Sequence, residues 1–113
     1  MENDRRPCLV LTAWPADRPV APFAQGLVDA RLAACVHAGP VGASVYRWHG
    51  AVESVEERPL VIKTVRACLV ALQAHVMAAH PYEVPEWLVL DVDGSAAYVA
   101  WLGDSVTEPE PTP

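Results

Sequence analysis

The chain is built from short apolar runs that alternate between two periods, and the order of these runs limits the fold more than any other feature. Residues 8–14, CLVLTAW, are rich in strand formers and are followed by PADRP, so they predict a buried first strand. Over residues 20–34, apolar side chains such as Phe23 and Leu27 recur at helical spacing and predict the first helix. Pro22 has no N–H to donate, so it belongs in the first turn of that helix.

The middle of the chain predicts a long β-hairpin. Residues 35–49 are compatible with β-structure, although AGPVG interrupts them, and residues 51–65 resume as the partner strand after Gly50, a typical turn residue. Pro59 cannot donate to a strand ladder, so we expect it at a bulge or at a sheet edge. An acidic group in the second strand is expected to cover the exposed end of the hairpin, and it comprises Glu53, Glu56 and Glu57.

The last part of the chain repeats the helix and strand pattern. A second helix is predicted over residues 67–79 and is ended by Pro81, and a final strand follows over residues 87–92. Ser95 is the predicted N-cap of a short helix over residues 96–103. The order strand, helix, strand, strand, helix, strand predicts an α+β ferredoxin-like (βαββαβ) antiparallel sheet, with both helices on one face and a short C-terminal helix appended.

Length and composition predict one domain that associates with itself. We expect a flexible N-terminus (residues 1–7), one domain (residues 8–104) and a disordered, acidic, proline-rich tail (residues 105–113). Hydrophobic residues make up 52% of the 113 residues and charged residues 19%, which is more apolar than a small monomer needs. The second face of the predicted sheet has no cover within the chain, so other subunits are expected to meet it.

Charge and cysteine content exclude several classes of protein. The net charge of −6 argues against binding a nucleic-acid backbone. The chain has no apolar run long enough for a transmembrane helix and no signal-peptide core at its N-terminus, so we expect a cytoplasmic protein that does not bind membranes. The three cysteines are far apart and have no CxxC spacing, so neither a disulfide framework nor a structural zinc site is expected.

Five motifs carry a resemblance to a known family. They are ARLAACVH (30–37), SVYRWHG (44–50), VIKT (61–64), HPYEVPEW (80–87) and YVAWL (98–102). In order and spacing these motifs resemble those of the CutA divalent-cation tolerance proteins. The resemblance implies a ferredoxin-like homotrimer in which the long hairpin joins sheets across subunits, and it implies tolerance to divalent cations and copper binding. The family's AAC cysteine matches Cys35, whereas His37 stands where the family often has asparagine.

Cys35 and His37 form the candidate metal pair. They are two residues apart on a predicted strand, so their side chains point to the same face. A thiolate beside an imidazole suits a divalent copper or zinc ion. Two ligands make an incomplete site, and another subunit or water would have to supply the rest. A buried cysteine is also common as a small packing residue, so this alternative stays open.

The connector HPYEVPEW and the hairpin supply a second group of candidate residues. Pro81 pushes His80 out of the α region, which makes His80 a natural helix terminator. The connector is expected to present Tyr82 and Glu83 at a subunit boundary, where Glu83 would pair with Arg47 or Lys63 of another subunit. The complete predicted set for a subunit interface or ligand cleft is Tyr46, Arg47, Trp48, Lys63, His80, Tyr82 and Glu83.

The motif content favours binding over catalysis. The sequence has no GxSxG, no HExxH and no glycine-rich phosphate loop. The leading hypothesis is a non-catalytic trimer that binds a divalent metal ion (Cu or Zn), without an organic cofactor, and acts in metal-ion tolerance. Two alternatives remain: a small-molecule signalling trimer similar to the PII proteins, and a structural trimeric scaffold for a protein partner.

Overall fold

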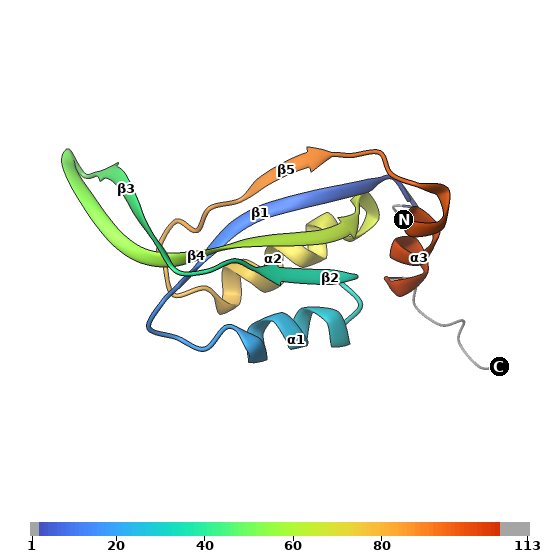
Figure 1. The fold of residues 1–113 in the computed structure, drawn as a ribbon, viewed down its shortest axis with the longest axis horizontal. Coiled ribbons are helices and arrows are strands. Elements are labelled where there is room, and N and C mark those ends of the chain that lie inside the picture. Colours follow the sequence, from blue (N-terminus) through green and yellow to red (C-terminus); the bar gives the residue numbers. More distant parts are fainter. Residues whose placement is uncertain (1–2, 107–113) are drawn as a thin grey trace.

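The computed structural model describes residues 3–106 and shows one twisted sheet with helices packed on one side (Figure 1). The elements run in the order β1 (Pro7–Pro15), α1 (Ala21–Asp29), β2 (Cys35–Ala38), β3 (Gly42–Trp48), β4 (Ala51–Val65), a 3-10 turn (Arg66–Cys68), α2 (Leu69–Ala79), β5 (Leu88–Asp91) and α3 (Ala96–Ser105). All strand pairs are antiparallel, in the order β2-β4-β1-β5 with β3 also on β4. The predicted α+β ferredoxin-like fold is confirmed.

The core lies between the sheet and helices α1 and α2. Alternate residues of the central strands point into it, such as Val10 and its cross-strand partner Ile62, and both are fully buried. The helices cover them with Leu27 of α1 and Leu72 of α2. These positions are the ones at which the strand and helix periods place apolar residues, so local pattern and packing agree.

The opposite face of the sheet is open within this chain. In β5, Leu88 and Leu90 pair with Leu11 and Leu9 of β1, and the β5 leucines are 57% and 47% exposed. Because Val89, between them, packs on the core, the leucines must face the other way. The expectation of an uncovered, apolar sheet face is therefore confirmed for the chain by itself.

Helix α1 is shorter than predicted. Its start at Ala21 places Pro22 in the first turn, as expected. The helix ends at Asp29, five residues before the predicted end at residue 34, because Arg31 adopts a left-handed backbone with φ of 58°. The amide of Leu32 then bonds back to the carbonyl of Leu27 and turns the chain toward β2.

The hairpin of β3 and β4 projects beyond the helices (Figure 1). Its strands pair from Gly42 and Glu57 to Trp48 and Ala51. His49 and Gly50 form the turn with positive φ angles of 48° and 80°, a combination that matches the twist of antiparallel strands. The predicted hairpin is confirmed.

Pro59 lies where the ladder on one side of β4 is interrupted. Three residues, 39–41, stand between Ala38 and Gly42, whereas only Arg58 and Pro59 stand opposite them in β4. This one-residue excess is a bulge. The carbonyl of Pro59 accepts from the amide of residue 39 on this side, so its ring nitrogen faces the same interrupted ladder, where no donor is required. The expectation of a bulge is confirmed.

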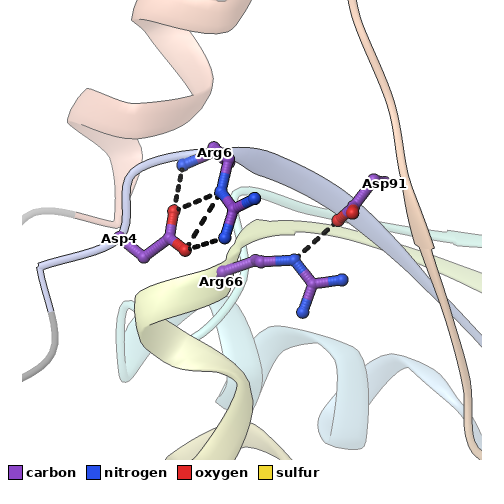
Figure 2. A network of polar contacts seen from close by, with 4 residues as sticks. All are labelled: Asp4, Arg6, Arg66 and Asp91. Atoms are coloured by element: carbon purple, nitrogen blue, oxygen red, sulfur yellow. Dashed lines mark hydrogen bonds and ion pairs between the residues drawn. The ribbon is translucent and has the colours of Figure 1, made fainter.

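The residues before β1 pack against the 3-10 turn that follows β4. Before β1, the main-chain oxygens of Asp4 and Arg6 accept from the amides of residues 67 and 66. Figure 2 shows the charges beside these bonds: Asp4 pairs with Arg6, and Arg66 contacts Asp91 at 2.6 Å. Residues 4–7 of the predicted flexible N-terminus thus make defined contacts, whereas residues 107–113 of the predicted tail lie outside the described part.

The C-terminal helix begins as predicted. The Ser95 side chain accepts a hydrogen bond from the amide of Tyr98 at 3.2 Å, so Ser95 is the N-cap of α3. Leu102 of α3 is buried against Val65 at the end of the sheet opposite to the hairpin tip (Figure 1). Over residues 3–106, no helix has the length and apolar character to cross a membrane.

Candidate functional site

The predicted metal pair lies on the open face of the sheet. Val36 packs on the core, so Cys35 and His37, on either side of it in β2, point the other way. Their cross-strand partners in β4 are Lys63 and Val61. Cys35 is a half-buried free thiol, and the His37 side chain is exposed. The prediction that the two share a face is confirmed, and it gives a thiol and an imidazole on one surface.

A cation stands beside Cys35. The Lys63 Nζ donates a hydrogen bond to the Tyr98 hydroxyl at 3.2 Å and lies 5.5 Å from the centre of its ring. The bond to Tyr98, followed by electrostatic interactions with Tyr98 and Cys35, raises the pKa of Lys63. Lys63 therefore stays charged at neutral pH. It competes with a bound cation for the negative charge of a Cys35 thiolate.

The metal pair is not completed within one chain. Among residues 3–106, no three histidine, cysteine, aspartate or glutamate side chains come close enough to hold an ion. Cys35 and His37 are thus at most half of the ligand set that copper or zinc usually takes. Any further ligand must come from water or from another molecule.

His80 lies in the interior of the chain. The amide of Tyr82 donates to its Nδ1 at 3.1 Å, so the ring proton is on Nε2, which donates to the main-chain oxygen of Ala13 at 2.6 Å. The ring also meets Trp14 edge-on, and only 7% of the residue is exposed. His80 caps α2, as the helix-terminator interpretation predicts. His80 is not among the residues that line the pocket described next. A role of His80 at a subunit interface stays a prediction.

Four other connector residues form one wall of a pocket of about 490 Å³ that the hairpin also lines. The connector supplies Tyr82, Glu83, Val84 and Glu86, β3 supplies Ser44, Tyr46 and Trp48, β4 supplies Glu53, Val55 and Glu57, and β1 supplies Ala13. Four of the residues predicted for a cleft are thus brought together: Tyr46, Trp48, Tyr82 and Glu83. The hairpin and the connector are far apart in the sequence, and the fold brings them together at this pocket.

Arg47 and Lys63 lie elsewhere. Arg47 alternates with Tyr46 and Trp48 along β3, so it points away from the pocket, and its guanidinium donates to the Gly50 carbonyl at 3.4 Å. Lys63 contacts Tyr98 on the open sheet face. The pairing of Glu83 with either cation across a subunit boundary stays a prediction.

The pocket is strongly acidic. Four glutamates line it, and no lysine, arginine or histidine is among the described residues around it. The Tyr82 hydroxyl donates to Glu57 Oε2 at 2.9 Å. Burial, and then this bond to a carboxylate, raise the pKa of Tyr82 to about 12, so its hydroxyl is a neutral donor at neutral pH. The site favours positively charged ligands.

Glu53 and Glu57 were predicted only to cover the exposed end of the hairpin, and the structure shows that they also line the pocket. Tyr46 pairs with Glu53 and Gly42 with Glu57, so the β4 glutamates share the face of the β3 aromatics. The turn at residue 50 and the period of two contain this information, since together they set the cross-strand register. The position of the connector beside that face of the hairpin cannot be predicted from a local sequence pattern.

Together, the antiparallel sheet, the helices on one of its faces and the projecting hairpin define a small α+β protein of the ferredoxin-like class. The model of the CutA1 divalent ion tolerance protein family matches residues 8–105. The chain therefore belongs to that family.

Individual relatives agree with this assignment. The chain is 41% identical over 95 residues to the protein CutA homolog of Xenopus laevis, a match that covers 83% of this chain and 63% of the relative. It is 38% identical to the divalent-cation tolerance protein CutA of Thermus thermophilus, with 86% and 95% covered. The crystal structure of CutA1 from Oryza sativa superposes with a TM-score of 0.85 at 35% identity and covers 96% of this chain and 100% of that one.

Proposed function

We propose that this chain is a non-catalytic, homotrimeric protein that binds a divalent metal ion, copper or zinc, and acts in metal-ion tolerance. Membership of the divalent ion tolerance family supports the role. The observation that carries the metal site is the side-by-side placement of Cys35 and His37 on an open sheet face. A thiolate and an imidazole are the ligand types that both metals accept.

Association of several copies is supported by the open face of the sheet. Leu88 and Leu90 expose about half of their surface there, and Trp101 of α3 is 47% exposed. Covering apolar surface stabilises an assembly by roughly 25 cal/mol per Å². Association also offers the metal pair the further ligands that one chain lacks. Light scattering is expected to give three times the chain mass of 12.2 kDa, and a monomer would contradict the proposal.

The metal site is tested by titration calorimetry, with Zn(II) in the presence of a non-chelating reductant and with Cu(II) on freshly reduced protein from which the reductant has been removed. Wild type is expected to bind, and the Cys35→Ala/His37→Ala variant is expected to lose at least about tenfold in affinity, since removing ligands leaves too few donors for a stable site. His75→Ala is the matched control, because His75 is an exposed histidine of α2. Equal affinity of wild type and the double variant would overturn the assignment.

The acidic pocket bears on the two alternative functions, a PII-like signalling trimer and a structural scaffold. A nucleotide-binding, PII-like role is disfavoured, because phosphates would meet four glutamates without a cation among the described lining residues. The pocket still favours a small-molecule ligand of the opposite charge. The scaffold alternative predicts a protein partner whose capture is independent of metal.

We also propose a cytoplasmic location. All three cysteines are free thiols, which suits a reducing compartment. The free thiols are the support for this proposal, and fractionation of cells that produce the tagged chain tests it.

A further inference from the structure

We propose that His80 is an acid-sensitive clamp, which holds the connector (residues 80–87) on β1 while its imidazole is neutral and releases it when the ring takes up a second proton. The clamp consists of the two hydrogen bonds of the ring, one with the amide of Tyr82 and one with the main-chain oxygen of Ala13. All of these groups belong to one chain, so the clamp needs no other subunit. It is also independent of the metal pair, which lies on β2.

The first argument is that the two hydrogen bonds require a neutral ring. A neutral imidazole has one nitrogen that donates and one that accepts, whereas a protonated imidazole can only donate. Nδ1 of His80 accepts from the amide of Tyr82 at 3.1 Å, and Nε2 donates to the carbonyl of Ala13 at 2.6 Å. A proton added to Nδ1 points at the N–H of Tyr82, so that bond breaks. Rotation of the ring cannot restore it, because an imidazolium has no acceptor.

The second argument is that the clamped ring is out of reach of water. Only 7% of His80 is exposed, and its ring lies 5.2 Å from that of Trp14 and 4.7 Å from that of Tyr82, measured between ring centres. A buried charge is costly unless water or an opposite charge solvates it. Water reaches the ring if the connector moves away from β1. Protonation therefore favours the released connector.

The charged and titratable groups around the ring do not remove this preference. From β1, His80 meets the Ala13 carbonyl and the Trp14 indole, and neither titrates. From the connector it meets Tyr82, a neutral phenol that donates to Glu57 of β4, and in the described part of the chain no carboxylate forms an ion pair with His80. The C-terminal end of α2, which His80 caps, does favour an imidazolium. That effect is typically smaller than the cost of leaving a buried amide unpaired.

Opening of the clamp is expected to loosen the connector at its first turn. Tyr82 is held by its amide at His80 and by its hydroxyl at Glu57. Loss of the amide bond frees the backbone of Tyr82, and a bond at the far end of a side chain does not fix a backbone. Histidine side chains change their charge between about pH 5 and 8, so the device responds to mild acid.

The test is amide hydrogen exchange, followed by NMR on the full-length chain in its native assembly at about pH 7.5 and about pH 5.5. After correction for the intrinsic effect of pH, protection of the Tyr82 amide is expected to fall at least about tenfold in acid. Protection of Ile62, a core residue of β4 paired on both sides, is expected to change less than about twofold. Unchanged protection at Tyr82, or an equal loss at Ile62, would overturn the proposal.

Two variants assign the effect to His80. His80→Gln keeps a donor and an acceptor but gains no proton in this range, so its Tyr82 protection is expected to be independent of pH after the same correction. His75→Gln is the matched control, because it removes an exposed histidine of α2, and it is expected to behave like wild type. The proposal fails if His80→Gln retains the wild-type pH dependence, or if His75→Gln abolishes it.

A measurement on the wild-type ring keeps the test decisive if His80→Gln does not fold. The ¹⁵N chemical shifts of Nδ1 and Nε2 distinguish the neutral ring from the imidazolium. They are expected to change over the same pH range as the protection of Tyr82. A protonated His80 ring beside a Tyr82 amide that stays protected would contradict the clamp, and so would a Tyr82 amide that opens while the ring stays neutral.

Discussion

The Nε2–H of His80 donates to the main-chain oxygen of Ala13 over 2.6 Å, and this bond joins the connector before β5 to β1. The same ring accepts from the amide of Tyr82, so one buried side chain sets the position of the pocket's connector wall against its sheet wall. A residue type usually associated with catalysis or metal binding thus acts here through its two hydrogen bonds.

Replacing His80 by alanine is expected to destabilise the fold. The change removes both ring hydrogen bonds and the edge contact with Trp14, and it leaves a cavity and an unpaired carbonyl. We expect a loss of about 2 to 4 kcal/mol in the free energy of unfolding. Denaturant titration at equal protein concentration measures it, with the exposed His75→Ala as control. A loss below about 0.5 kcal/mol, typical of surface changes, would contradict the clamp.

Gly39→Ala is expected to be poorly tolerated at the bulge. A Cβ added to Gly39 would lie 2.8 Å from Cγ of Pro59, and the proline ring cannot move away freely. The resulting overpacking is expected to cost about 1 to 3 kcal/mol. Gly42→Ala is the matched control on the same stretch, because a Cβ there meets nothing within 4 Å. The prediction fails if thermal melting shifts equally in both variants.

Tyr82→Phe is expected to change the pH dependence of stability on the alkaline side. Burial and the bond to Glu57 raise the pKa of Tyr82 from 10.0 to about 12. The folded chain therefore holds this proton more tightly than the unfolded chain, so the contribution is complete below pH 10 and is lost between about pH 10 and 12. Urea titrations across this range should show a shallower decline in Tyr82→Phe, and identical slopes would refute the assignment.

Cys8 is expected to resist alkylation until the chain unfolds. It is fully buried, and burial raises its pKa from 9.0 to about 11. At pH 8 its thiolate is about 100-fold rarer than in the unfolded chain, and the thiolate is the reactive form. Peptide mapping after iodoacetamide treatment should find Cys68, which is partly exposed, labelled well before Cys8. Labelling of both at one rate in folded protein would contradict this.

Local sequence patterns account for most of the fold. The helical spacing of apolar residues in α2 matches its buried face, which holds Leu72 and Val76. Pro22, Gly50 and Ser95 occupy the turn or cap positions that their chemistry favours. The end of α1 was not predictable, because residues 30–34 have an apolar, alanine-rich sequence compatible with a helix. The helix ends at Asp29, and the following residues lead into β2, which pairs with β4. The end of the helix is therefore set by tertiary packing.

The candidate site shows the same division. That Cys35 and His37 share a face follows from the two-residue period of a strand, and it needs no tertiary information. The acidic character of the hairpin face also lies in the sequence, since the turn at Gly50 sets Tyr46 opposite Glu53. The interior position of His80 does not, because its partner Ala13 is 67 residues away.

The sequence by itself determined the elements, their faces and the family, because periodicity, proline and glycine act on residues that are neighbours along the chain. Only the tertiary structure decided that the hairpin and the connector enclose one acidic, aromatic pocket. The bond between Tyr82 and Glu57 spans 25 residues, and the hydrogen bonds of His80 to Ala13 and Tyr82 hold the connector where this bond can form. A local sequence pattern cannot predict a contact between residues that are so far apart in the chain.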